Sequence, residues 1–334
     1  MKKTMYFFNP GTLERRDNTL KFTAHNAQGV KGDVRFIPVE NVDELCIFGD
    51  LDANSAMYNF LGQQNICVHF FNYYEHYTGS FMPREYLLAG KVQVLQTKFY
   101  LQARKRMPLA KTLLAGAAAN MMQVLKYYGN RGIAIGEPLE RMETHRANLD
   151  QATNVSELMG LEGNIRSEYY AGFNPIIKNF EMAGRQKRPP KNEVNALISY
   201  GNMLCYTQCL KQIYHTQLNP TISFLHEPGY RRYSLALDLA EIFKPILVDR
   251  LIFSLLNKKI LQAKDFRWEF NKCLLKPSGA KTFTRFWDAK INETIKHRAL
   301  KRKVSYKQLI RLECYKLVKH LLGDLAYKPY KLLW

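Results

Sequence analysis

The stretch SFLHEPGYRRYSLALDLAEIFKPILVDR, residues 223–250, places a histidine directly before an acidic helix. In its second half, apolar residues surround nearly the whole helical circumference, which is typical of a helix inside a protein. Asp238 and Glu241 nevertheless share one face, and Asp249 returns to that face about three turns after Asp238. Buried carboxylates are costly unless a cation or a metal ion meets them. With His226 just upstream, the stretch predicts half of a metal site.

The best candidate for the other half is Glu162, in SELMGLEGNIRSEYY. On a helix it shares a face with Leu158, Ile165 and Tyr169, so we expect it to point inward. An inward glutamate pairs more often with Arg or Lys than with a metal, and a lone histidine is more often a satisfied polar residue than a ligand. Together, however, one imidazole and two carboxylates form a more specific set, which suits Mg²⁺ or Mn²⁺ better than structural zinc.

Residues 1–82 are predicted to form a small β-sandwich, because short runs rich in aromatic and β-branched residues alternate with turn signals. One helix is expected at 53–61. The predicted strands are 4–8, 19–23, 34–38, 44–48, 66–71 and 77–81.

From residue 83 the apolar period becomes helical, which predicts a larger, all-α domain over 83–334 and an α+β protein overall. Pro245 falls inside the acidic helix and removes one backbone hydrogen bond, so a bend is expected there. The predicted helices are 86–107, 109–128, 154–170, 194–214, 234–256 and 306–322.

The charge balance is strongly basic, with 49 Lys and Arg against 29 Asp and Glu and a formal net charge of +20. Such an excess favours a polyanionic partner, since each neutralised phosphate releases counterions. The basic loop at 184–191 and the basic run at 296–303 are either solvated or in contact with phosphates. The candidate DNA-binding residues are Arg185, Lys187, Arg188, Arg231, Arg232, Lys244 and Arg250.

Neither export nor membrane insertion is indicated. No apolar stretch approaches the ~20 residues that span a bilayer, and the apolar run after the N-terminal lysines is too short for a signal peptide. The six cysteines are scattered, so we expect reduced core residues in a cytoplasmic protein.

Several motifs together resemble the CRISPR-associated integrase and endonuclease family Cas1. They are NALISYG at 195–201, FLH at 224–226, LALDLAEIFKP at 235–245, VDR at 248–250 and LEG at 161–163. The opening MYF at 5–7 and NTL at 18–20 are similar to members from subtype I-B systems. Two positions depart from many members, Ser223 in place of Gly and Lys244 in place of Arg.

The resemblance implies an N-terminal β-sandwich that dimerises, a helical catalytic domain, and a homodimer that assembles with the small partner Cas2 into a heterohexamer. It implies metal-dependent joining of 3′-hydroxyl ends of short captured DNA to the CRISPR repeat. Its metal set falls on Glu162, His226 and Glu241, with Asp238 as a contender for the third position or a supporting carboxylate.

Two alternatives follow from the residues alone. A metal-dependent nuclease would cut DNA with water and need no 3′-hydroxyl donor. A non-catalytic DNA-binding scaffold would bind without metal, and it would leave the buried carboxylates of Glu162, Asp238 and Glu241 unexplained.

Overall fold

The computed structural model describes residues 2–26, 28–72, 74–84, 87, 89–186, 189–229, 233–297 and 300–332. The chain divides into two compact units, Met1–Tyr86 and Leu87–Trp334. The division lies four residues after the boundary that we expected at residue 82.

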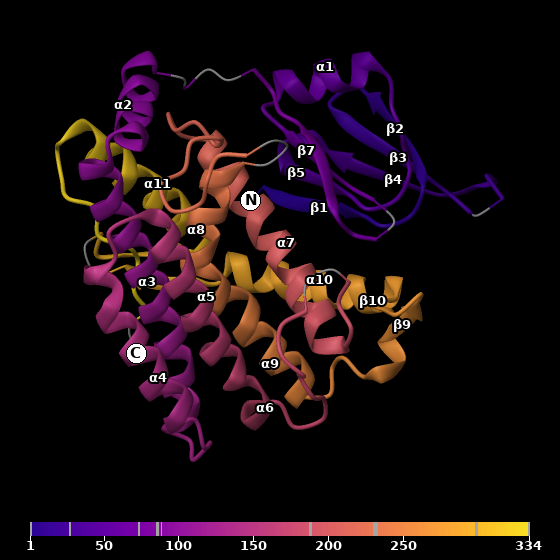
Figure 1. Ribbon diagram of the computed structural model, residues 1–334. Coiled ribbons are helices and arrows are strands. Elements are labelled where there is room, and N and C mark those ends of the chain that lie inside the picture. The colour runs from indigo at the N-terminus through magenta and orange to yellow at the C-terminus, as the bar shows by residue number, and fades with distance from the viewer. Residues whose placement is uncertain are drawn as a thin grey trace. The chain divides into compact units, whose positions relative to one another are not determined.

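The first unit contains two four-stranded sheets (Figure 1). One sheet has the order β1-β5-β7-β8, with β1 and β5 and then β5 and β7 parallel, and β7 and β8 antiparallel. The other has the order β4-β3-β2-β6. The strands are β1 (Lys3–Phe7), β2 (Gly11–Arg16), β3 (Thr19–His25), β4 (Lys31–Pro38), β5 (Val42–Ile47), β6 (Leu51–Asp52), β7 (Cys67–Phe71) and β8 (Tyr77–Phe81).

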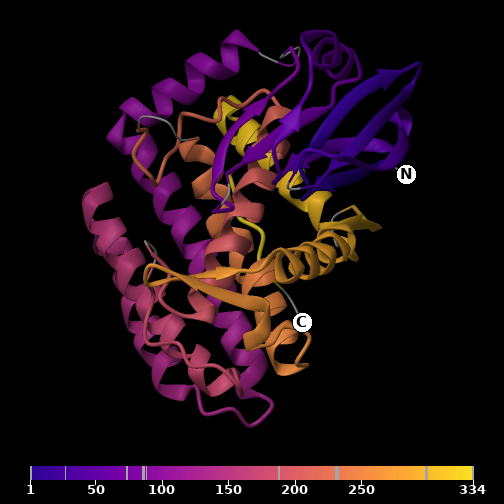
Figure 2. The ribbon, with the colours of Figure 1, turned by 90° about the vertical axis from the view of Figure 1, so that its right-hand side faces the viewer.

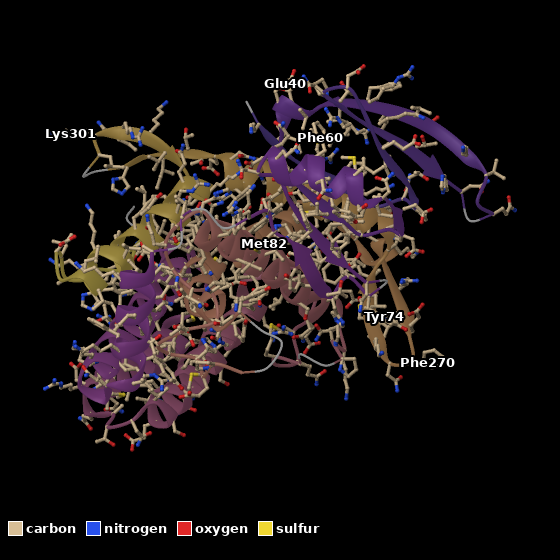
Figure 3. The ribbon with its side chains drawn as sticks, turned by 90° about the horizontal axis from the view of Figure 1, so that it is seen from above. Glu40, Phe60, Tyr74, Met82, Phe270 and Lys301 are labelled. Carbon is tan, nitrogen blue, oxygen red and sulfur yellow. The ribbon has the colours of Figure 1, made fainter. Side chains whose placement is uncertain are left out.

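A single hydrophobic core joins these two sheets, which confirms the predicted sandwich. Leu20 and Phe22 of β3, Val42 of β5 and Val68 of β7 are all buried in it. The helix α1 (Ser55–Gln63) adds Phe60, which Figure 3 labels. β2 and β6 were not among the predicted strands.

The second unit is mostly helical, and several of its helices run alongside one another while α10 lies across them (Figures 1 and 2). The long α3 packs against α5 and α8, and α7 packs against α8. The helices are α2 (Gly90–Leu101), α3 (Ala103–Gly129), α4 (Gly136–Ala147), α5 (Val155–Ala171), α6 (Phe173–Ile176), α7 (Glu193–Tyr214), α8 (Ser234–Lys244), α9 (Arg250–Asn257), α10 (Pro277–Asn292) and α11 (Tyr306–Leu322), with short 3₁₀ turns at Asn148–Gln151 and Ala263–Asp265.

We predicted an all-α second unit. This prediction is wrong, because the unit also contains two β-hairpins. β9 (Phe266–Glu269) pairs with β10 (Lys272–Leu275), and β11 (Thr294–His297) pairs with β12 (Arg302–Ser305). The first hairpin turns through two residues with positive φ, Phe270 at 44° and Asn271 at 62°. Four-residue strands are too short to show a period, which explains the error.

The boundary between the first two helices differs from the prediction, whereas the acidic helix spans nearly the predicted range of 234–256. The break between α2 and α3 is at Gln102, where ψ is 103°, and Pro108 lies inside α3. The acidic helix continues past Pro245 through a π-helical segment, Pro245–Asp249, in which the Arg250 N–H donates to the Pro245 carbonyl. Proline has no backbone N–H to donate within the helix, and the wider π-helical turn accommodates this missing hydrogen bond. The helix therefore continues into α9 without a break.

All six cysteines are free and buried, as expected. In the part of the chain that the structure describes, no helix is both long and apolar enough to cross a membrane.

Candidate active site

His226 lies in the loop before α8, and Asp238 of that helix holds the loop in place. The Asp238 carboxylate accepts hydrogen bonds from the backbone N–H groups of Phe224, Leu225 and His226, at 2.7, 3.0 and 2.9 Å. Its Oδ1 also lies 2.8 Å from His226 Nδ1. Asp238 is 0% exposed, and these contacts use both of its oxygens. Since Nδ1 faces Asp238, Nε2 is the ring nitrogen that can ligate a metal.

Other elements hold the same loop from further sides. Arg106 of α3 donates from Nε to the Phe224 carbonyl at 2.8 Å and from its guanidinium to Glu227 at 2.6 Å. The Ser223 hydroxyl donates to the His226 carbonyl at 2.5 Å. Ser223, which departs from the family pattern, therefore supports the backbone of the histidine itself. The contact between Arg106 and this loop could not be predicted from the local sequence, because 118 residues separate Arg106 from its partner Phe224.

Glu162 and Glu241 are brought together by a shared cation, Arg166. Arg166 Nε and Nη2 lie 2.6 and 2.5 Å from Glu162 Oε1, one turn earlier on α5. The same Nη2 donates to Glu241 Oε2 on α8. Lys244 contacts the other oxygen of Glu241 at 2.7 Å. We call Glu162, Arg166, His226, Asp238, Glu241 and Lys244 the charged cluster.

The pKa values of Glu241 and His226 are shifted toward the charged forms of both groups. Burial alone would raise the pKa of Glu241, but Arg166 and then Lys244 outweigh it and hold that pKa well below its usual range. Burial would likewise lower the pKa of His226, yet the hydrogen bond to Asp238 raises it overall. The buried glutamate is therefore an anion at neutral pH.

The donor set of the cluster suits a divalent cation in kind. Two carboxylates converge on one point beside an imidazole, and oxygen-rich sets of this type bind Mg²⁺ or Mn²⁺. As placed, however, no group of three or more His, Cys, Asp or Glu side chains within the described residues is arranged to hold a metal. The Arg166 guanidinium occupies the intervening position.

Asp249, the third acidic residue of the opening stretch, does not join the cluster. Its Oδ2 accepts a hydrogen bond from the Tyr169 hydroxyl at 3.0 Å, and its Oδ1 is buried without a hydrogen-bond partner. Burial raises the pKa of Asp249 to about 7, although Tyr169 and Arg166 oppose the shift. Asp249 therefore titrates near neutrality beneath the cluster.

Of the three DNA-binding candidates that the structure describes, Arg185 and Lys244 contact other side chains of the protein. Arg185 donates to Asn195 at 2.8 Å and to Ser199 at 3.1 Å. The Lys244 side chain is only 12% exposed and contacts Glu241. Arg250 instead lines an open groove. Lys187, Arg188, Arg231 and Arg232 lie outside the described residues.

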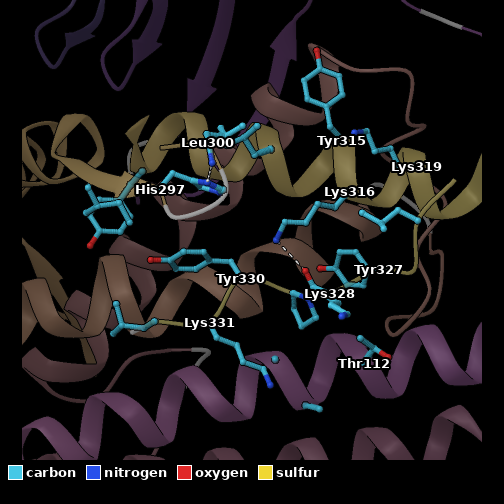
Figure 4. A pocket seen from close by; sticks show the side chains of 18 of the residues that line it. Thr112, His297, Leu300, Tyr315, Lys316, Lys319, Tyr327, Lys328, Tyr330 and Lys331 are labelled. Atoms are coloured by element: carbon cyan, nitrogen blue, oxygen red, sulfur yellow. Dashed lines mark hydrogen bonds between the residues drawn. The ribbon is translucent and has the colours of Figure 1, made fainter. Parts of the chain in front are cut away.

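That groove, with a volume of about 1410 Å³, lies between α3, α11, the β11–β12 hairpin and the C-terminal segment (Figure 4). The C-terminal segment is held in place, since the Tyr327 hydroxyl and the Tyr330 N–H donate to Glu313 at 2.6 and 3.1 Å. Among the described residues, eight basic side chains and four tyrosines line the groove together with aliphatic ones, and the lining acid Glu293 is bound by Lys290 at 2.6 Å. We call it the basic groove; its basic residues are Arg250, Lys290, Lys296, His297, Lys316, Lys319, Lys328 and Lys331.

The fold and the charged cluster together define a strongly basic two-domain protein with a carboxylate and imidazole site on its helical unit. The chain belongs to the Cas1 family, since the family model described as CRISPR associated protein Cas1 matches residues 5–289.

Individual relatives agree with this assignment. The chain is 46% identical over 333 residues to the CRISPR-associated endonuclease Cas1 3 of Thermodesulfovibrio yellowstonii, covering 99% of this chain and 100% of that one. The solved Cas1 protein of Thermotoga maritima superposes with a TM-score of 0.87 at 37% identity, covering 98% and 100%. A casposase bound to its integration product shares the fold, with a TM-score of 0.86 at 19% identity over 98% and 92%.

Proposed function

We propose that this protein is a metal-dependent DNA integrase and endonuclease, which inserts short captured DNA into a CRISPR array. The bond that forms joins a 3′-hydroxyl end to a phosphorus of the repeat, and the bond that breaks releases the displaced strand. The observation that carries this proposal is the convergence of Glu162 and Glu241 beside His226 in a chain of the Cas1 family.

Glu162, His226 and Glu241 would hold one Mg²⁺ or Mn²⁺. When bound, such an ion polarises a phosphoryl oxygen and lowers the pKa of an attacking hydroxyl. We assign the third position to Glu241 because both oxygens of Asp238 are already used by loop N–H groups and His226. Asp238 then acts through His226 as a positioning residue.

Double-stranded DNA is the proposed substrate, and the net charge of +20 and the basic groove support it. By resemblance, we further propose a homodimer through residues 1–82 and a heterohexamer with Cas2, in the cytoplasm of a prokaryote.

A hydrolytic nuclease is the second candidate, which the name endonuclease of the Thermodesulfovibrio yellowstonii relative favours. The scaffold alternative is stronger than the sequence alone suggested. Arg166 and Lys244 give Glu162 and Glu241 partners that account for their burial without any metal.

A strand-joining assay separates the three functions. A labelled short duplex with free 3′-hydroxyl ends is mixed with a supercoiled plasmid that carries a leader and repeat, together with Cas2. Wild type and His226→Ala are compared with Mn²⁺ and with chelator. We expect label transfer that needs metal, His226 and the 3′-hydroxyl. Nicking without transfer would instead indicate the nuclease, and binding that chelator leaves unchanged would indicate the scaffold.

A further inference from the structure

We propose that the Arg166 guanidinium occupies the position between Glu162 and Glu241 that the divalent cation takes, so that metal binding displaces Arg166. The inference rests on the proposed function, because it assumes that these carboxylates are metal ligands. The inference adds that Arg166 competes with the metal for the two carboxylates and that, without metal, Arg166 stays bound between them.

The geometry carries the proposal. A single nitrogen, Arg166 Nη2, contacts a carboxylate oxygen of Glu162 on α5 and one of Glu241 on α8. A metal ligated by these same two oxygens would take the position of Arg166 Nη2. The two cations therefore exclude each other.

Charge balance points the same way. The side chains of Glu162, Arg166, Glu241 and Lys244 are only 12, 13, 7 and 12% exposed. With Asp238, the cluster holds three carboxylates against two cations, so a divalent ion bound beside a neutral His226 would leave one uncompensated positive charge in a poorly solvated place, which is costly. Release of Arg166 removes that charge.

Arg166 is the cation that has to leave, and Lys244 is not. Lys244 contacts Glu241 through Oε1, whereas Arg166 contacts Oε2, and Lys244 lies three residues along the same helix. It can remain while the ion binds. Substitution of Lys244 thus provides a matched control that removes the same charge from the same glutamate without opening the bridging position.

The test is an equilibrium Mn²⁺ titration of the full chain, followed through the electron paramagnetic resonance signal of free Mn²⁺, without DNA. We expect Arg166→Gln to bind Mn²⁺ at least about tenfold more tightly than wild type, because the competing cation is gone. Lys244→Gln should tighten binding less. In chelator, Arg166→Gln should melt at a lower temperature than wild type, and Mn²⁺ should restore more of its stability.

Unchanged or weaker Mn²⁺ binding by Arg166→Gln, or an equal gain in Lys244→Gln, would overturn the proposal. If Arg166→Gln fails to fold, Arg166→Lys keeps the charge but loses the two-point contact, and a smaller gain in affinity is expected. Glu162→Gln and His226→Ala identify which idea fails. If neither weakens Mn²⁺ binding, the metal site is wrong; if both do while Arg166→Gln gains nothing, only the displacement is wrong.

Discussion

At the scale of single residues, Asp238 combines four hydrogen-bond contacts with complete burial. Replacing it with Asn keeps the volume but points an NH₂ group at backbone N–H donors. We expect Asp238→Asn to lower the free energy of unfolding by about 2–4 kcal/mol, measured by urea denaturation. An NMR titration should show the pKa of His226 falling, because its carboxylate partner is lost.

The exposed Asp324 provides the control, since Asp324→Asn should change stability by less than about 0.5 kcal/mol. A loss for Asp238→Asn no greater than this would mean that the loop does not depend on Asp238.

The raised pKa of Asp249 predicts that the free energy of unfolding falls as the pH rises. Its folded pKa of about 7 lies above its ordinary value of 3.8, so its contribution to stability is complete below pH 4 and is lost as the pH rises to 7. Between pH 5 and 8 the wild type should lose on the order of a few kcal/mol through this group.

Asp249→Asn should flatten that loss, because the amide stays neutral and still accepts from Tyr169. His226, whose pKa is also raised, contributes in the same direction in both proteins, so the difference between the two isolates Asp249. Denaturation curves with equal pH slopes would refute the effect.

At the scale of elements, α7 approaches the π-helical segment so closely that only glycine fits at Gly201. A Cβ there would lie 2.4 Å from Val248 Cγ1 and 3.0 Å from Phe283 Cζ. We expect Gly201→Ala to lower the free energy of unfolding by about 1–3 kcal/mol. Gly160 is also helical but has nothing within 4 Å, so Gly160→Ala should raise it by about 0.5–1 kcal/mol. Thermal denaturation checks both, and a stabilised Gly201→Ala would contradict the close packing.

Two of the most accurately predicted elements have a strong local signal, although α10 has one too and was not predicted. The helix expected at 306–322 is α11, and that at 154–170 differs by one residue from α5, because both combine an apolar period with a capping residue, Ser305 or Asn154. By contrast α4 buries only Met142, so its amphipathic pattern was too weak to find.

The candidate site shows the same division. Arg166 lies one helical turn after Glu162, so an ion pair between the two could be predicted from their spacing in the sequence. Its second partner, Glu241, is 75 residues away and comes from the packing of α5 near α8. Only the fold reveals that one guanidinium joins the two proposed ligands.

At the scale of the whole molecule, the net charge of +20 supports the proposed DNA binding most strongly where basic side chains gather. In the basic groove, Lys296, Lys319 and Lys331 are exposed. We expect the triple change of these lysines to Gln to weaken binding of a short duplex. The slope of log K against log salt should become shallower by about 0.9 for each lysine that contacts a phosphate.

Three exposed lysines of the same unit outside the groove, Lys178, Lys258 and Lys264, provide a control of equal net charge. Fluorescence anisotropy at several salt concentrations measures both triple variants. If DNA binds along the groove, the slope of log K against log salt becomes shallower only in the groove variant, because counterion release depends on local contacts with phosphate. If the attraction came from the overall charge, both variants would lose affinity equally and the groove would have no special role.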